Sequence, residues 1–259
     1  MVPWLLEILR TGTVTTRFPR GPVPNTGPFR GYLRADSARG CADCRRCVGT
    51  CPSPALGWKN NGLSVDQAAC LRCNLCVAAC PEGNLSFSPS PLGAVRHRDA
   101  LRKPMASTPP PPPAASKVLR RSLALRTVDA GSCGACEAEI QALANPFYDL
   151  TRLGLSFTPT PKHADTLLVT GPVTAGMAAP LDAALEAMPE PRLVIAVGAC
   201  ATGGGPFPTS AFSHGGLDTR LTPCVYVPGC PPHPLAILEG ILLALGRAEE
   251  SLPTKEAAG

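Results

Sequence analysis

The 259-residue sequence predicts two domains of different fold class, an α+β domain followed by an α/β domain built on a parallel sheet. The first class is indicated by a cysteine motif that occurs twice between residues 41 and 81. The second is indicated by apolar runs that alternate with helical patterns after residue 121, beyond a stretch of five consecutive prolines. A hydrophobic content of 44% is sufficient for a core in each domain.

Residues 1–35 are predicted to be an N-terminal docking segment that begins with a short helix. Four apolar residues have helical spacing there: Trp4, Leu5, Ile8 and Leu9. The stretch from Thr11 to Pro24 has too many prolines and glycines for regular structure.

Residues 36–102 are predicted to form a two-[4Fe-4S] ferredoxin-like domain. The motif Cys-x-x-Cys-x-x-Cys-x-x-x-Cys-Pro occurs twice in it, as in bacterial two-cluster ferredoxins, in which each fourth cysteine ligates the other cluster. One cluster is expected to use Cys41, Cys44, Cys47 and Cys80. The other is expected to use Cys70, Cys73, Cys76 and Cys51. Pro52 and Pro81 are expected to end the helices that carry the fourth ligands. A double zinc site is the alternative, although tetrahedral zinc does not need such a run of cysteines.

Residues 103–120 are predicted to be a linker, because five prolines follow one another at positions 109 to 113. Such a stretch favours extended polyproline II and would act as a semi-rigid spacer of roughly 30 to 40 Å. The alternative is a proline-rich ligand for a partner domain.

Residues 121–248 are predicted to form a flavodoxin-like α/β domain, followed by a tail at residues 249–259. The expected strands are residues 123–128, 165–171, 192–198 and 224–227, and the expected helices are residues 137–144, 177–188 and 235–247. Cysteines follow three of these strands: Cys133 and Cys136, then Cys200, then Cys230. Because the carboxyl ends of parallel strands meet at one edge of a sheet, the four thiols are expected to surround one metal centre.

A structural zinc site is the alternative for Cys133 and Cys136, since Cys-x-x-Cys is common in zinc ribbons. A ribbon would normally bring its second pair as another Cys-x-x-Cys. Here Cys200 and Cys230 are single, and each lies in a loop rich in glycine and proline that suits backbone N–H donation to cluster sulfurs.

The three cysteine loops read Gly-Ser-Cys-x-x-Cys-x-x-Glu, Gly-x-Cys-Ala-x-x-Gly-Gly and Val-Pro-Gly-Cys-Pro-Pro. Over about residues 120–248 this pattern resembles the small subunit of membrane-bound, energy-converting [NiFe] hydrogenases, including formate hydrogenlyase. It resembles more distantly the complex I subunit that carries the terminal cluster before quinone. In that subunit two cysteines are adjacent, whereas Gly134 and Ala135 intervene here, as in the hydrogenase branch. The resemblance implies that the proximal [4Fe-4S] cluster, beside a catalytic site in another chain, is bound by Cys133, Cys136, Cys200 and Cys230.

The first part of the chain has a resemblance of its own. Its Leu-x-Thr-Gly-x-Val-Thr lead, followed by two ferredoxin motifs, looks like the two-cluster subunit of complex I and of formate hydrogenlyase, whose N-terminal helix rests on membrane-side subunits. The chain therefore looks like a fusion of two subunits that are normally encoded separately.

Together the resemblances imply an electron-transfer subunit of a membrane-associated [NiFe] hydrogenase, with three [4Fe-4S] clusters and no catalytic residue of its own. The expected partners are a hydrogenase-type large subunit, membrane subunits reached through other chains, and a soluble ferredoxin or another outer donor or acceptor. One alternative is an iron–sulfur subunit of a nickel-free, hydrogenase-related or complex I-like NADH/ferredoxin:quinone oxidoreductase. Another, of a different class, is a zinc-stabilised scaffold.

Charge and cysteine use bear on location and partners. Residues 1–106 hold 14 Lys and Arg against 6 Asp and Glu, a balance of +8, which suits compensation of buried cluster anions and docking on acidic partners. Nucleic-acid binding is not expected, because no basic helix or aromatic platform is present. Of 13 cysteines, 12 fit cluster motifs, which predicts a reducing compartment.

No secretory signal opens the chain, and no apolar stretch is long enough for a transmembrane segment. The expected location is the cytoplasm, with peripheral membrane association through partner subunits. Three residues outside the motifs have simpler predicted roles. Cys224 is expected to be a structural thiol, His233 to start a helix, and Glu137 to be a first-turn acid.

Overall fold

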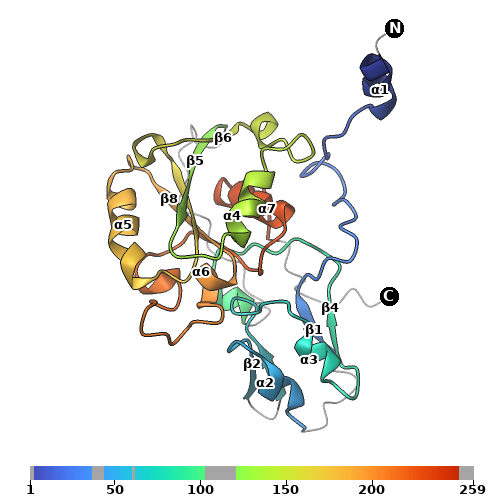
Figure 1. Cartoon of the computed structure of the whole chain (residues 1–259), viewed down its shortest axis with the longest axis vertical. Helices are drawn as coiled ribbons and strands as arrows, with labels where there is room; N and C mark the ends of the chain where they lie inside the picture. The colour runs from blue at the N-terminus through green and yellow to red at the C-terminus, as the bar shows by residue number, and fades with distance from the viewer. Residues whose placement is uncertain (1–2, 37–43, 60–61, 103–120, 251–259) are drawn as a thin grey trace.

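The computed structural model describes residues 3–36, 44–59, 62–102 and 121–250, which form two parts packed against each other (Figure 1). We call residues 33–102 the ferredoxin-like domain and residues 121–250 the sheet domain. The predicted linker, residues 103–120, lies outside the described residues, as does Cys41.

The ferredoxin-like domain consists of two small antiparallel sheets and two short helices. Its elements are β1 (Leu33–Ala35), α2 (Arg46–Thr50), β2 (Leu56–Lys59), β3 (Gly62–Val65), α3 (Leu75–Ala78) and β4 (Leu85–Phe87). Strand β1 pairs with β4, and β2 pairs with β3. The core is small: Leu33, Leu56 and Leu85 pack with cysteine side chains from both motifs. Because cysteine side chains form part of this core, metal binding by their thiols would also affect how the core packs.

The two short helices differ from the expectation in one respect. Each carries the third cysteine of its motif, Cys47 or Cys76, and ends before the fourth. Cys51 is the C-cap of α2 and has extended backbone angles, φ −70° and ψ 120°. The reason is local, because Pro52 disfavours the helical conformation for the residue that precedes it.

The sheet domain contains a five-stranded parallel sheet. Its strands are β5 (Leu123–Asp129), β6 (Leu155–Phe157), β7 (Thr166–Thr170), β8 (Leu193–Val197) and β9 (Val225–Val227). They lie in the order β6-β5-β7-β8-β9, which is the flavodoxin-like order of strands 2-1-3-4-5. Four strands confirm the sequence prediction. The edge strand β6 was missed, because it has only three residues and two of them are exposed.

Helices cover both faces of this sheet. They are α4 (Ala135–Ala142), α5 (Ala175–Glu186), α6 (Ala199–Gly203) and α7 (Pro234–Ala244). Alternate strand residues pack on opposite sides: Leu168 and Ile195 face α4 and α7, whereas Leu167 and Val194 face α5 and α6. The strands are accordingly apolar throughout, as expected for a parallel sheet buried on two sides. Short 3₁₀ helices occur at Arg98–Leu101, Leu150–Leu153, Pro161–His163 and Leu217–Thr219.

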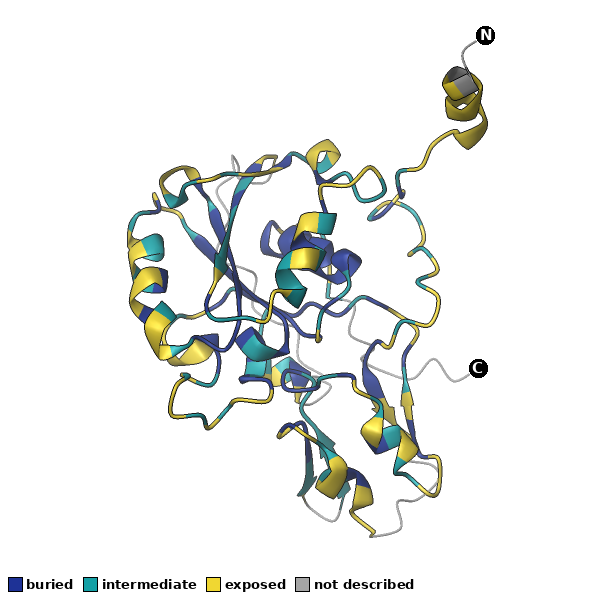
Figure 2. Cartoon of the chain, in the orientation of Figure 1, coloured by how far each residue is buried: buried dark blue, intermediate teal, exposed yellow. Residues whose placement is uncertain are grey.

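Helix α7 is buried along its whole length, as Figure 2 shows, and it includes a carboxylate. Glu239 is only 2% exposed, and its Oε2 accepts hydrogen bonds from the backbone N–H groups of Gly93 (2.6 Å) and Ala94 (3.0 Å). Val95, which follows Ala94 in the chain, exchanges two backbone hydrogen bonds with Tyr226 in β9, at 3.0 and 2.7 Å. The end of the ferredoxin-like domain is therefore fixed to the sheet domain.

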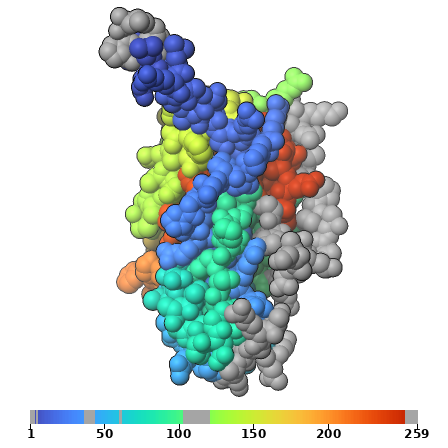
Figure 3. Space-filling view, turned by 90° about the vertical axis from the view of Figure 1, so that its right-hand side faces the viewer, coloured from blue at the N-terminus to red at the C-terminus, as the bar shows by residue number. Residues whose placement is uncertain are grey.

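The segment 12–32 has no helix or strand, as its proline and glycine content predicted. It nevertheless contacts both domains, and Figure 3 shows it in blue across their shared surface. Thr16 N–H donates to the Phe147 carbonyl at 2.8 Å, and Phe18 is buried in the core that includes α7. Phe29 lies edge-on to His233, with 5.1 Å between ring centroids.

Helix α1 (Pro3–Thr11) stands away from the rest of the protein in Figure 1. Its exposed apolar side chains are Trp4, Leu6, Ile8 and Leu9. None of the helices in the described ranges combines the length and the apolar character needed to cross a bilayer.

Replacement of Glu239 tests the link between the domains. In Glu239→Ala, two buried N–H groups lose their acceptor, so we expect the free energy of unfolding to fall by about 2–5 kcal/mol. Glu239→Gln keeps one acceptor oxygen of similar position and should lose clearly less. Urea unfolding of the full chain, followed by circular dichroism, measures both. Equal midpoints for Glu239→Ala and the parent would show that these hydrogen bonds do not hold the interface.

Candidate metal centres

The turn after β5 is shaped by short polar side chains. The Asp129 Oδ1 atom accepts hydrogen bonds from Gly131 N–H (2.8 Å) and Ser132 N–H (2.6 Å). Ser132 Oγ accepts from Gly134 N–H at 2.9 Å and donates to Glu137 Oε2 at 2.8 Å. Glu137 therefore has the structural role that its position in the first turn of α4 suggested.

The two thiols of this turn differ in their exposure to solvent. Cys133 lies exposed within it, whereas Cys136 is partly buried in the first turn of α4. Gly134 begins the helix in the left-handed region, with φ +83°. The two intervening residues thus let the chain turn between the thiols.

The loops after β8 and β9 are bonded to each other. Gly198 N–H donates to the Val227 carbonyl at 2.8 Å, and Ala199 N–H donates to the Gly229 carbonyl at 2.7 Å. Cys200 follows in α6 and Cys230 follows Gly229, so the two loops bring these thiols to the same edge of the sheet.

Four of the five cysteines of the sheet domain, Cys133, Cys136, Cys200 and Cys230, lie at this edge. Burial raises the pKa of Cys136, and Glu137 and the other three thiols raise it further. Burial raises the pKa of Cys200 to about 11, with Cys230 and Cys133 adding to the effect. The four thiols therefore act on one another's pKa values, and their binding of one metal centre stays a prediction.

The space around these sulfurs depends on glycine. A Cβ atom at Gly198 would lie 2.5 Å from the Cys136 sulfur, and one at Gly205 would lie 2.8 Å from the Cys200 sulfur. No three His, Cys, Asp or Glu side chains in the described ranges are close enough to bind a single ion. Four cysteine thiols from three neighbouring loops fit the number and type of ligands that a [4Fe-4S] cluster takes.

A second set of thiols lines a small cavity in the ferredoxin-like domain. Its cysteines are Cys51, Cys70, Cys73 and Cys76. Burial raises the pKa of Cys76 to about 11, and Cys70, Cys51 and Cys73 add to the effect. The fourth cysteine of the first motif therefore lies with the first three of the second motif, which is the crossed grouping expected from the sequence.

The third set is described only in part. Cys44 is exposed, Cys47 is buried and Cys80 is partly buried, and Cys80 packs against the core that contains Cys47. Helices α2 and α3 contact each other, so the two motifs are side by side. The fourth predicted member, Cys41, lies outside the described residues.

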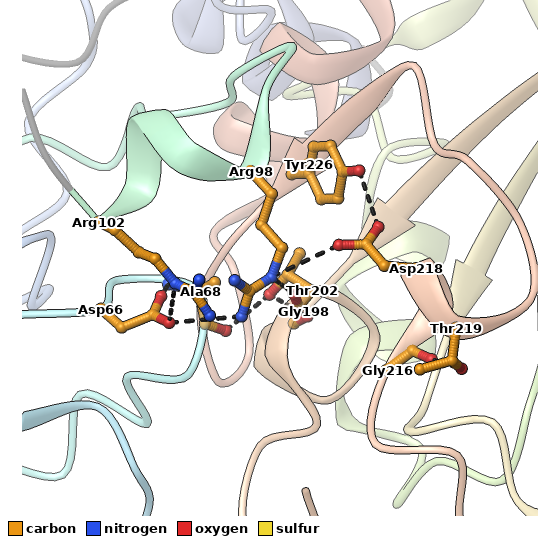
Figure 4. Close-up of polar contacts among 10 residues, drawn as sticks. All are labelled: Asp66, Ala68, Arg98, Arg102, Gly198, Thr202, Gly216, Asp218, Thr219 and Tyr226. Atoms are coloured by element: carbon orange, nitrogen blue, oxygen red, sulfur yellow. Dashed lines mark hydrogen bonds and ion pairs between the residues drawn. The ribbon is translucent and has the colours of Figure 1, made fainter. Parts of the chain in front are cut away.

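A polar network holds the second motif against the sheet domain (Figure 4). The Thr202 hydroxyl, in the helix that carries Cys200, donates to the Ala68 carbonyl at 2.7 Å. Arg98 Nε donates to the Thr202 carbonyl at 2.8 Å, and the Arg98 guanidinium pairs with Asp66 at 3.3 Å and with Asp218 at 3.5 Å. These contacts fix the chain just before Cys70 next to the helix of Cys200.

The remaining candidate residues have simple surroundings. His233 Nδ1 accepts from Leu235 N–H at 3.1 Å, which confirms its predicted place at the start of a helix. The Cys224 thiol donates to the Val194 carbonyl at 3.2 Å, and its structural role stays a prediction.

The sequence did not predict that Arg72 is buried or that Gly198 lies against the Cys136 sulfur. Arg72 is 7% exposed and its Nη2 donates to the Pro228 carbonyl at 3.0 Å, in the loop that carries Cys230. No sequence pattern distinguishes it from the exposed arginines nearby. Glu239, by contrast, carried a signal, because a lone charge inside an apolar helix implies a buried partner.

Comparison with known families gives two matches. Residues 133–244 match the family described as NADH ubiquinone oxidoreductase, 20 Kd subunit, and residues 40–85 match the 4Fe-4S dicluster domain. The two matches correspond to the sheet domain and to the ferredoxin-like domain.

Among individual relatives, the chain is 46% identical over 129 residues to the "probable membrane-bound hydrogenase subunit mbhJ" of Pyrococcus furiosus, covering 50% of this chain and 77% of the relative. It is 42% identical over 136 residues to formate hydrogenlyase subunit 7 of Escherichia coli, covering 52% of this chain and 53% of that protein. A chain of the membrane-bound sulfane sulfur reductase, an archaeal respiratory membrane complex, aligns with a TM-score of 0.44 and 30% identity, over 54% of this chain and 80% of that one.

Two glycine substitutions separate backbone strain from crowding of a sulfur. Gly134 lies in the left-handed region (φ +83°, ψ −12°), where alanine costs about 1–2 kcal/mol, whereas Gly198 (φ +92°, ψ 159°) lies in a region almost restricted to glycine, where alanine costs about 1–3 kcal/mol. Only at Gly198 does the new Cβ approach a thiol, since nothing lies within 4 Å at Gly134. If Cys136 and Cys200 bind a cluster, we expect Gly198→Ala to lose the iron of that one centre, about four iron atoms per chain, and Gly134→Ala to keep it. Iron analysis of anaerobically purified protein measures this, and equal iron in the two variants would contradict it.

Proposed function

Because this chain belongs to the NADH ubiquinone oxidoreductase 20 Kd subunit family and also has a 4Fe-4S dicluster domain, we propose that it is the iron–sulfur electron-transfer subunit of a membrane-bound [NiFe] hydrogenase. The observation that carries the proposal is the meeting of Cys133, Cys136, Cys200 and Cys230 at one edge of the sheet. The two residues between Cys133 and Cys136 favour the hydrogenase branch over the complex I pattern of adjacent cysteines.

The proposed cofactors are three [4Fe-4S] clusters. The proximal site uses Cys133, Cys136, Cys200 and Cys230, and the middle site uses Cys51, Cys70, Cys73 and Cys76. The outer site uses Cys41, Cys44, Cys47 and Cys80. When bound, each such cluster takes up or gives up one electron at a time.

The protein's role is to hold these sites in sequence. Arg72, which precedes Cys73, donates a hydrogen bond to the Pro228 carbonyl in the loop of Cys230 at 3.0 Å, which supports adjacency of the middle and proximal sites. Helices α2 and α3 place the outer site beside the middle one. An electron entering at the proximal site would therefore pass through the middle site to the outer site, or in reverse.

The chemistry belongs to a partner. Oxidation of H₂ gives two protons and two electrons, and a nickel–iron centre for this reaction would lie in a large subunit, since 12 of the 13 cysteines here are assigned to clusters. The exposed apolar side chains of α1 support a docking role toward membrane-side subunits. The chain itself would associate with the membrane through those partners.

Metal analysis tests the proposal against its nearest alternative, a nickel-free complex I-like oxidoreductase. The complex purified anaerobically through this chain should contain about 13 iron atoms per chain, 12 from three clusters of four and one from the nickel–iron centre, and nickel in about equal amount to the chain. It should reduce a dye with H₂, and Cys133→Ser should lower that activity at least about tenfold, whereas Cys224→Ser should retain it. Full iron without nickel or H₂ activity would leave an electron-transfer subunit of another oxidoreductase. Zinc in place of iron would reject both.

The crossed ligation has its own test. Cys51→Ser should remove or alter the EPR signal of the middle cluster, because Cys51 lies with Cys70 and Cys76 and not with the thiols next to it in sequence. Cys80→Ser is the matched variant and should affect the outer cluster. If Cys51→Ser instead alters the outer cluster, the grouping is wrong.

A further inference from the structure

One buried cation lies between two of the thiol sets. Arg72 stands between Cys70 and Cys73 in the second motif, and its side chain reaches the loop of the sheet domain that carries Cys230. The acceptor there is the Pro228 carbonyl, 3.0 Å from Nη2. A single guanidinium therefore spans the junction between the middle and proximal sites.

Aromatic rings fix this guanidinium. Its carbon lies 5.4 Å from the centroid of Phe29 and 5.5 Å from that of Tyr32, both in the range of cation–π interactions. Phe29 belongs to the segment that crosses both domains, and Tyr32 is buried next to β1. The rings exclude water from Arg72 without neutralising its charge.

The hydrogen bonding of Arg72 is incomplete. Its Nη1 atom is buried and has no hydrogen-bond partner among the described residues. A buried donor without an acceptor is costly, and a buried cation without a compensating anion more so. The arrangement thus requires an acceptor and a negative charge that protein atoms of the described ranges do not supply to Nη1.

The position of Arg72 indicates where the negative charge comes from. Arg72 lies between Cys70 and Cys73 in the chain, and its Nη2 atom bonds to the loop of Cys230, so it is next to ligands of both proposed sites. A [4Fe-4S] cluster held by four thiolates is anionic, so a cluster bound at either site would supply the missing negative charge. A guanidinium stays charged throughout, since its pKa in proteins remains above about 12.

We propose that Arg72 is a positioning residue shared by the middle and proximal clusters, which raises the reduction potential of both by placing one fixed positive charge and one free N–H donor between them. This rests on the proposed cluster ligation. Reduction adds negative charge to a cluster, so a nearby cation stabilises the reduced form. Net charge, hydrogen bonds to sulfur and exclusion of solvent are the means by which proteins set cluster potentials.

The test is an anaerobic redox titration of the full complex, followed by EPR, with three substitutions at one position. Arg72→Met removes the charge and the donor but keeps an apolar stem, Arg72→Gln keeps a donor, and Arg72→Lys keeps the charge. In Arg72→Met we expect the reduced-to-oxidised ratio of both clusters at a fixed potential to fall at least about tenfold, a shift of about 59 mV toward negative potential for a one-electron couple. Arg72→Gln should shift in the same direction, and Arg72→Lys should stay closer to the parent.

Arg46 provides the matched control. It adjoins Cys47 in the first motif as Arg72 adjoins Cys73 in the second, but it is exposed. Water and salt screen its charge, so Arg46→Gln should change the ratio less than about twofold at every cluster.

The outcomes separate this inference from the proposed function. Full iron with unchanged potentials in Arg72→Met would overturn the role of Arg72 and leave the electron-transfer function standing. Little iron in the parent protein would overturn the ligation itself. If Arg72→Met fails to assemble, the comparison moves to Arg72→Gln and Arg72→Lys. A more negative potential for Gln than for Lys supports the charge, and equal potentials reject it.

Discussion

The parallel alignment of β5, β8 and β9 is the constraint on which the candidate centre of the sheet domain depends. Cysteines separated by up to 97 positions, from Cys133 to Cys230, can meet only because all three strands end at the same edge. Backbone hydrogen bonds between the loops after β8 and β9 then set the distance between Cys200 and Cys230. Apolar strands buried on both faces keep this edge rigid. The core of the domain thus determines where the sulfur atoms lie.

The sequence predicted those features that depend on a residue and its near neighbours along the chain. Cysteine spacing grouped Cys51 with the second motif, and proline and glycine content predicted the irregular segment from residue 12 onward. Four strands and the helices α4, α5 and α7 of the sheet domain followed from sequence patterns, whereas the five-residue helix α6 was not predicted. The edge strand β6 did not, because it depends on pairing with β5 and buries only Leu155 well. The crowding at Gly198 was equally inaccessible, since it arises from a contact with Cys136 across the fold.

The junction between the domains could not be predicted from motifs, because its contacts join residues far apart in sequence. Thr202 bonds to Ala68, Arg72 to Pro228 and Glu239 to the segment after β4. Each lies within a few residues of a cluster motif or in the helix that closes the sheet. The ferredoxin-like domain and the sheet domain are therefore held together by specific polar contacts, which favours a constant distance between the thiol sets of the two domains.

The segment that crosses both domains has a consequence for biosynthesis. Thr16 and Phe18 are made early, yet their partners, Phe147 and the residues of α7, leave the ribosome more than a hundred residues later. The hydrogen bonds of Val95 with Tyr226, and of Gly93 with Glu239, likewise cannot form until those later residues have been synthesised. The ferredoxin-like half can therefore form its own small core first. The surface of the second half that it contacts is complete only after α7 has been synthesised. The thiols of the first half are thus available for metal binding before the contacts with the second half can form.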